Sequence, residues 1–78
     1  MDKVCVIGLG SWGSALALTL CKNGYEVHMW TRNESQANEI NTTRENSRFL
    51  PGVIFPKEIK ISTDLESVIK DSKIIVLA

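Results

Sequence analysis

The fold is decided by residues 3–13, Lys3-Val4-Cys5-Val6-Ile7-Gly8-Leu9-Gly10-Ser11-Trp12-Gly13. The first five residues form a β-branched apolar run, which is typical of a strand buried on both faces of a parallel sheet. The remaining six have the spacing Gly-x-Gly-x-x-Gly, and helix-forming residues follow from Ser14. This spacing is a weak signal alone. Between a strand and a helix, it predicts a site for the pyrophosphate of a dinucleotide.

Each residue of the glycine-rich turn has an expected role. Gly8 permits the tight turn, Gly10 lets the backbone approach the pyrophosphate, and Gly13 lets the helix pack closely on the strand. The backbone amides around Ser11 and Trp12 then point at the phosphates, aided by about half a positive charge at the helix N-terminus. We therefore expect all five of these residues to bind the cofactor.

Trp12 is an unusual residue for such a turn, because a large aromatic side chain there needs somewhere to pack. It either stacks on the ligand or fills the adjacent core. We favour the core as its main position, and both positions allow the indole to touch the edge of the cofactor.

The rest of the chain alternates strands and helices. Asn23-Gly24 ends the first helix, because glycine adopts the left-handed conformation at no steric cost. We predict strands at Tyr25–Trp30, Ile59–Ser62 and Lys73–Leu77, and helices at 34–42 and at 65–69, the last capped by Asp64. The order β-α-β-α-β-α-β predicts an α/β fold of the Rossmann type, with a doubly wound parallel sheet and right-handed crossovers.

A long irregular segment, residues 44–56, separates the second helix from the third strand, and Pro51-Gly52 marks a turn within it. Loops of this length inside a compact domain are usually functional or mobile. The chain stops at Ala78, directly after the fourth strand, where a doubly wound fold has a further ligand-binding loop. We therefore expect residues 1–78 to be the first, incomplete part of a dinucleotide-binding domain.

Composition excludes several classes of partner. The 78 residues suffice for one small core, and nine Lys and Arg balance nine Asp and Glu. With no net charge the chain is not expected to bind nucleic acid or an anionic membrane surface. It has no apolar run long enough for a membrane span and no targeting sequence. Cys5 and Cys21 are expected to be reduced thiols, and the protein to be cytoplasmic.

The choice of cofactor depends on the residues after the second strand. NAD-specific folds place an acidic residue about 20 positions beyond the glycines, whereas NADP-using folds place Arg nearby. Here Trp30-Thr31-Arg32-Asn33 contains no acid before Glu34. The guanidinium of Arg32 can make a charge-assisted bond to a 2'-phosphate, so we expect NADPH to be preferred over NADH.

No cluster of catalytic or metal-ligating residues is apparent in the chain, and we assign none. His28 is the only histidine, lies mid-strand without a carboxylate or serine at a telling spacing, and is assigned a structural role. Hydride transfer agrees with this lack of catalytic residues, because the cofactor carries the chemistry and the protein supplies orientation and electrostatics.

The residues resemble the NAD(P)-dependent glycerol-3-phosphate dehydrogenases, especially the bacterial form. The resemblance spans nearly the whole chain and rests on three stretches: residues 8–17, Trp30-Thr31-Arg32, and the loop Asn41-Thr42-Thr43-Arg44-Glu45-Asn46-Ser47-Arg48-Phe49-Leu50-Pro51-Gly52. The tryptophan form of the glycine turn together with this loop is far more specific than the glycines alone.

The resemblance implies an oxidoreductase that interconverts sn-glycerol 3-phosphate and dihydroxyacetone phosphate for glycerophospholipid synthesis, acting as a homodimer. It also implies cofactor contacts from Ser11, Trp12 and Arg32, with Asn33 a weaker candidate beside the adenosine phosphate. Phe49 stands where the family often has tyrosine. Any role of a hydroxyl group is therefore lost there, although the ring can still pack near the cofactor.

The family's catalytic lysine, its other substrate-binding residues and its helical C-terminal domain lie beyond Ala78. The 78-residue piece is accordingly expected to be inactive alone. Two alternatives stay open at this point: a non-catalytic NAD(P)-sensing module, because function resides in sites rather than folds, and a related dehydrogenase such as a ketopantoate reductase. The Leu50-Pro51-Gly52 loop argues against the latter.

Overall fold

The computed structural model describes residues 2–78, and its elements follow the predicted order. The strands are β1 (Lys3–Ile7), β2 (Glu26–Trp30), β3 (Lys60–Ser62) and β4 (Ile74–Leu77), and the helices are α1 (Ser11–Lys22), α2 (Glu34–Thr43) and α3 (Leu65–Ile69). Helix α1 begins inside the glycine turn rather than after it, with Gly10 as its N-cap. The other predicted bounds differ from the observed ones by at most one residue.

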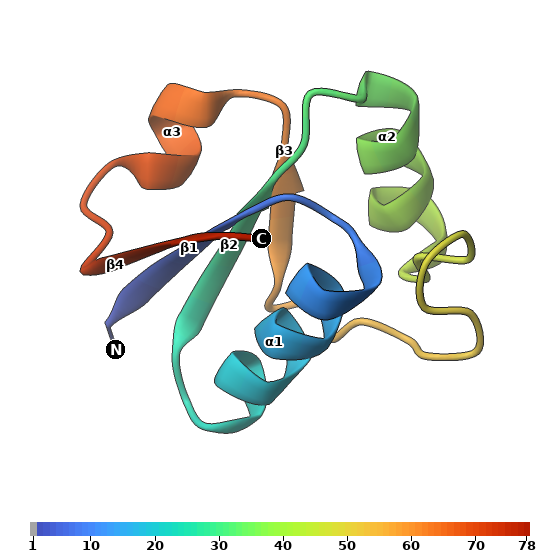
Figure 1. Ribbon diagram of the computed structural model, residues 1–78, viewed down its shortest axis with the longest axis horizontal. Coiled ribbons are helices and arrows are strands. Elements are labelled where there is room, and N and C mark those ends of the chain that lie inside the picture. The colour runs from blue at the N-terminus through green and yellow to red at the C-terminus, as the bar shows by residue number, and fades with distance from the viewer. Residues whose placement is uncertain (1) are drawn as a thin grey trace.

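The four strands form one parallel sheet in the order β3-β2-β1-β4. Strand β1 therefore lies inside the sheet, as its apolar run predicts. Figure 1 shows α1 and α2 on one side of the sheet and α3 on the other. The Rossmann-type α/β fold class is thus confirmed.

The main core lies between the sheet and helices α1 and α2. Alternate residues of the strands face it, because successive side chains of a strand point to opposite sides. Full burial of a Val, Ile, Met or Phe side chain stabilises the fold by roughly 1.5–3 kcal/mol each. The buried cluster consists of Val6, Leu9, Ala17, Val27, Met29, Ala37, Ile40, Phe55, Ile59 and Ile61.

The opposite face of β2 carries a hydrogen-bonded pair of side chains that sequence reasoning missed. His28 Nε2 lies 2.7 Å from Glu26 Oε2, so the view that His28 has no carboxylate partner is wrong. The two residues are two apart in a strand and therefore share a face. The hydrogen bond from His28 lowers the pKa of the Glu26 carboxyl below its usual range. The His28 side chain is 20% exposed and the Glu26 side chain 46% exposed.

The two cysteines are free thiols, as expected. Cys5 is buried in β1, and burial raises the pKa of its thiol, with Lys3 opposing this effect.

The long segment between α2 and β3 is packed against the domain rather than extended from it. Arg44 ends α2 in the left-handed conformation, with φ 62°. Its guanidinium then donates to the carbonyl oxygens of Pro56 at 2.6 Å and Ile59 at 2.7 Å. An antiparallel bridge joins Glu45 to Ile54, and Phe55 is buried in the core. These contacts therefore bind the segment to the rest of the domain.

We predict that Arg44→Met lowers the free energy of unfolding by about 2–3 kcal/mol, because two charge-assisted hydrogen bonds to carbonyl groups are lost. Urea unfolding measures this change. The control is Arg48→Met, at an exposed position of the same loop, which should change stability by no more than about 0.5 kcal/mol. Equal stability of the two variants would contradict the conclusion that the hydrogen bonds of Arg44 to Pro56 and Ile59 stabilise the loop.

Candidate functional site

The carboxyl ends of β1 and β2 bring the predicted site residues to one edge of the sheet. In the parallel register Ile7 pairs with Trp30, and the Gly8 N–H donates to the Trp30 carbonyl oxygen at 2.8 Å. The glycine turn and residues 31–33 therefore leave the sheet side by side. In addition, β1 is the strand at which the chain order reverses, since β2 and β3 lie on one side of it and β4 on the other. Ligands of open α/β sheets bind at this place.

Two of the three glycines are required by packing within the domain. Gly8 has φ 123°, and a Cβ on it would lie 2.7 Å from the Ala78 carbonyl oxygen. A Cβ on Gly13 would lie 2.9 Å from Ala78 Cβ and 3.3 Å from the Gly8 carbonyl oxygen. The close approach of α1 to Gly8 and Ala78 thus depends on Gly13.

Gly10 differs from these two glycines. A Cβ placed on it would meet nothing within 4 Å, and its φ is an ordinary −67°. Nothing inside the domain therefore requires glycine at this position. The open space beside its backbone is what a closely approaching ligand needs.

The first turn of α1 is open to an anion. Its N-cap, Gly10, makes no side-chain cap hydrogen bond, and the turn contains no acidic residue. By contrast, Asn33 caps α2 and Asp64 caps α3 with side-chain oxygens, and each of those helices has Glu in its first turn. The first N–H groups of any helix lack intrahelical partners and attract negative charge. In α1 these groups can serve a ligand.

Trp12 does not fill the core, so the packing role favoured from the sequence is wrong. Its side chain is 62% exposed, because Gly13, Ser14 and Ala17 form the face of α1 that turns toward the sheet. The indole lies on the outside of the glycine turn. It can therefore contact a molecule bound there.

Arg32 and Asn33 follow β2 at the same edge of the sheet. Arg32 is exposed. Asn33 is the N-cap of α2: its Oδ1 accepts from the Gln36 N–H at 3.0 Å, and its own N–H donates to Thr31 Oγ1 at 3.1 Å. The Oδ1 of Asn33 accepts the capping hydrogen bond. Its Nδ2 is the side-chain donor that could bind a ligand. Its main role in the structure is to begin α2.

Asn46 is a residue of this region that sequence reasoning did not single out. It is 1% exposed, and its Nδ2 donates to the Leu9 carbonyl oxygen at 2.6 Å and to Ser14 Oγ at 3.0 Å. Ser14 Oγ also donates to the Leu9 carbonyl oxygen, at 3.3 Å. The long loop is thereby bonded to the glycine turn. The only signal in the sequence was the presence of Asn46 in the loop that carries the family resemblance.

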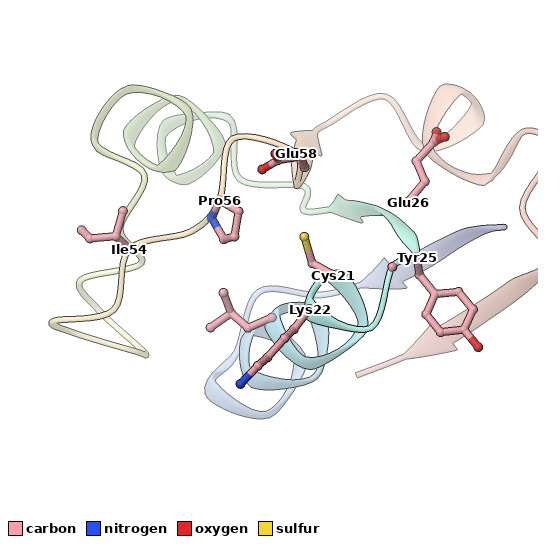
Figure 2. A pocket seen from close by; sticks show the side chains of 9 residues that line it. Cys21, Lys22, Tyr25, Glu26, Ile54, Pro56 and Glu58 are labelled. Atoms are coloured by element: carbon pink, nitrogen blue, oxygen red, sulfur yellow. The ribbon is translucent and has the colours of Figure 1, made fainter. Parts of the chain in front are cut away.

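An apolar hollow lies elsewhere, at the other end of α1. It measures about 530 Å³ and is lined mainly by apolar atoms between the end of α1, the start of β2 and the segment around Pro56. Figure 2 shows Cys21 and Pro56 on its wall, with Lys22, Tyr25 and Glu58 around it. It contains none of the predicted site residues. A smaller polar hollow of about 140 Å³ lies between the start of α2 and the loop, lined in part by Asn33, Gln36, Asn46 and Arg48.

Within residues 2–78 no group of three or more His, Cys, Asp or Glu side chains is arranged to hold a metal ion. In the same part of the chain, no helix combines the length and apolar character that crossing a membrane requires.

Comparisons with known proteins agree on one family. Residues 3–78 match the family described as NAD-dependent glycerol-3-phosphate dehydrogenase N-terminus. The chain is 47% identical over 77 residues to glycerol-3-phosphate dehydrogenase (NAD(P)+) of Bacillus mycoides, covering 99% of this chain and 23% of that protein. It is 47% identical over 74 residues to the protein of the same name from Pelotomaculum thermopropionicum, covering 95% and 21%.

A solved structure shares the fold. The crystal structure of glycerol-3-phosphate dehydrogenase from Coxiella burnetii superposes with a TM-score of 0.91 at 32% identity, over 97% of this chain and 23% of that one. The chain thus spans about a quarter of the length of the proteins it matches.

The glycines provide a paired prediction for the site. Gly10→Ala should change the free energy of unfolding by no more than about 1 kcal/mol, because the new methyl group meets open space, yet it should weaken dinucleotide binding. Gly13→Ala should lower the free energy of unfolding by about 1–3 kcal/mol, because the methyl group is forced against Ala78 and the Gly8 carbonyl group. Thermal unfolding and calorimetric titration measure the two effects. Undiminished dinucleotide binding in a folded Gly10→Ala variant would place the ligand elsewhere.

Proposed function

The chain belongs to the family of N-terminal segments of NAD-dependent glycerol-3-phosphate dehydrogenase, and we propose that it binds the adenosine half of NAD(P)H for the interconversion of sn-glycerol 3-phosphate and dihydroxyacetone phosphate. The observation that carries the proposal is the uncapped start of α1 beside the open backbone of Gly10. It lies at the edge of the sheet where ligands of this fold class bind.

The pyrophosphate would be held by backbone rather than by side chains. The amides of Gly10, Ser11 and Trp12 lie at the N-terminus of α1, where the helix dipole adds about half a positive charge. Gly8 and Gly13 set the path of this backbone through the turn. The exposed indole of Trp12 would pack against the cofactor from outside. These residues together bind and orient the dinucleotide.

When bound, NAD(P)H supplies the hydride, and the residues of this chain only position it. Asn33 would add a donor, Nδ2, near the adenosine. Its location at the start of α2, beside the exposed Arg32, supports this assignment.

NADPH is the preferred cofactor in this proposal. Arg32 is exposed just after β2, at the edge that holds the glycine turn, and no acidic residue lies between the end of β2 and Glu34. A guanidinium can bind a 2'-phosphate with charge-assisted, bidentate hydrogen bonds. An acidic residue, which would bind the unphosphorylated ribose hydroxyls, does not occupy this position.

The complete protein would be a longer oxidoreductase. Residues 1–78 would form the first part of its NAD(P)-binding domain, and a helical domain would supply the substrate-binding groups and the catalytic lysine. The relatives are about four times as long as this chain, which supports this arrangement. So does the exposure of the apolar edge strand β4, where Leu77 is 79% exposed. We further propose a cytoplasmic homodimer that serves glycerophospholipid synthesis.

The full-length protein should reduce dihydroxyacetone phosphate with a higher kcat/KM for NADPH than for NADH. Arg32→Ala should lower kcat/KM for NADPH by about 10- to 100-fold, since a hydrogen bond to a charged group contributes roughly 1.5–3 kcal/mol. The same variant should change the value for NADH by less than about threefold. Loss of NADPH or NADH absorbance measures the respective rate.

Lys22→Ala is the control for that measurement, because it removes a cation at the far end of α1. It should leave both values unchanged. Equal kcat/KM for the two cofactors, unaltered in Arg32→Ala, would refute the preference. An absence of dihydroxyacetone phosphate reduction with either cofactor would refute the proposed activity.

A further inference from the structure

The side-chain amide of Asn46 is hydrogen-bonded to one peptide group of the glycine turn. Asn46 lies in the loop that follows α2, yet its Nδ2 reaches back 37 residues to donate to the Leu9 carbonyl oxygen at 2.6 Å. Ser14 Oγ approaches the same oxygen at 3.3 Å. Leu9 is the residue between Gly8 and Gly10. Its carbonyl oxygen is thereby turned inward, toward two donors.

The orientation of this carbonyl group determines where the Gly10 N–H points. A peptide group is planar and trans, so the C=O of Leu9 and the N–H of Gly10 point in opposite directions. With the Leu9 oxygen directed at Asn46, the Gly10 N–H is directed away from the interior. The surroundings of Gly10 leave room for a ligand, since a Cβ built on this residue would meet nothing within 4 Å. An inward carbonyl therefore presents an outward amide.

This orientation needs to be enforced, because the turn is flexible by composition. Glycine adopts both signs of φ at little cost, so a peptide group flanked by Gly10 can rotate. Rotation would direct the Leu9 oxygen outward, where its partial negative charge would repel a phosphate. The Leu9 side chain is buried and anchors one end of the peptide group. The hydrogen bond from Asn46 anchors the other.

Asn46 is itself held by the loop rather than by the turn. The Leu50 N–H donates to the Asn46 carbonyl oxygen at 2.8 Å, and Glu45 Oε2 accepts from the Gly52 N–H at 2.9 Å. Arg44 fixes the far side of the loop through Pro56 and Ile59. The loop is thus bonded to itself and to the segment before β3, and it presents one buried amide to the glycine turn.

We propose that Asn46 is a positioning residue for the dinucleotide: it holds the Leu9–Gly10 peptide group with the amide outward, ready to bind a pyrophosphate oxygen. This inference rests on the proposed function of the turn. It gives the long loop a role in cofactor affinity that does not require the loop to touch the cofactor.

The test compares two isosteric substitutions in the full-length protein. Asn46→Asp keeps the shape of the side chain but replaces the donor with an oxygen that repels the Leu9 carbonyl. Asn23→Asp is the matched control: Asn23 Nδ2 donates to the Thr19 carbonyl oxygen at 2.8 Å, at the other end of α1. Two readouts are taken, the Kd for NADPH by calorimetry and the amide NMR signal of Gly10 in 15N-glycine-labelled protein, assigned from its absence in Gly10→Ala.

We expect Asn46→Asp to raise the Kd by about tenfold or more and to shift the Gly10 signal before any cofactor is added. Asn23→Asp should lower the unfolding temperature but leave the Kd and the Gly10 signal unchanged. If Asn46→Asp does not fold, Ser14→Ala is used in its place for the same two measurements. It removes one donor to Leu9 and one partner of Asn46 from a helix that tolerates alanine, and should shift the Gly10 signal and raise the Kd by about threefold.

An unchanged Kd and an unchanged Gly10 signal in the folded variant would overturn the inference. Failure of the wild-type protein to bind NADPH would instead overturn the proposed function. The Gly10 signal separates these two outcomes, because it reports the peptide orientation without cofactor.

Discussion

Helix α1 starts so close to Gly8 and to Ala78, the residue after β4, that no side chain fits at Gly13. A Cβ there would lie 2.9 Å from Ala78 Cβ and 3.3 Å from the Gly8 carbonyl oxygen. The helix begins within the glycine turn, so its first N–H groups lie at the carboxyl edge of the sheet. The parallel register of β1 and β2 then brings Arg32 and Asn33 to the same edge. The candidate site follows from these two constraints.

The division between capped and uncapped helices agrees with this arrangement. At the start of α2 and of α3, a side-chain oxygen of Asn33 or Asp64 accepts a hydrogen bond from a first-turn N–H group, so each helix is capped by its own N-cap residue. Helix α1 has no such cap and relies on its surroundings. A domain that binds no anion would gain stability from a side-chain cap at this position, typically ~1 kcal/mol. The absence of a cap is therefore more readily explained by a ligand than by folding.

Most of the fold could be predicted from the sequence, because it depends on local periodicity. The apolar run of Lys3–Ile7, the glycines and the Asn23-Gly24 stop each act within a few residues. Two predictions from the sequence were wrong, for different reasons. Trp12 was placed in the core because its size suggested burial, whereas its position on the helix directs it outward. The pairing of His28 with Glu26 was overlooked, although their spacing in a strand puts both on one face.

Asn46 could not have been found from one sequence. An asparagine in a polar loop has the same local signature whether it faces solvent or is buried, and only the folded loop brings it to Leu9. Likewise, the hollow near Cys21 combines three separate segments. Sequence patterns predict elements well, but contacts between a long loop and a distant turn depend on the path of the whole chain.

We propose that the amides at the start of α1 hold the pyrophosphate of a dinucleotide, and a crystal structure of the full-length protein with NADPH would locate the bound cofactor. We expect pyrophosphate oxygens within hydrogen-bonding distance, about 3 Å, of the backbone nitrogens of Gly10 and Ser11, with the 2'-phosphate beside Arg32. A cofactor bound away from the glycine turn, for example in the hollow at the other end of α1, would contradict it.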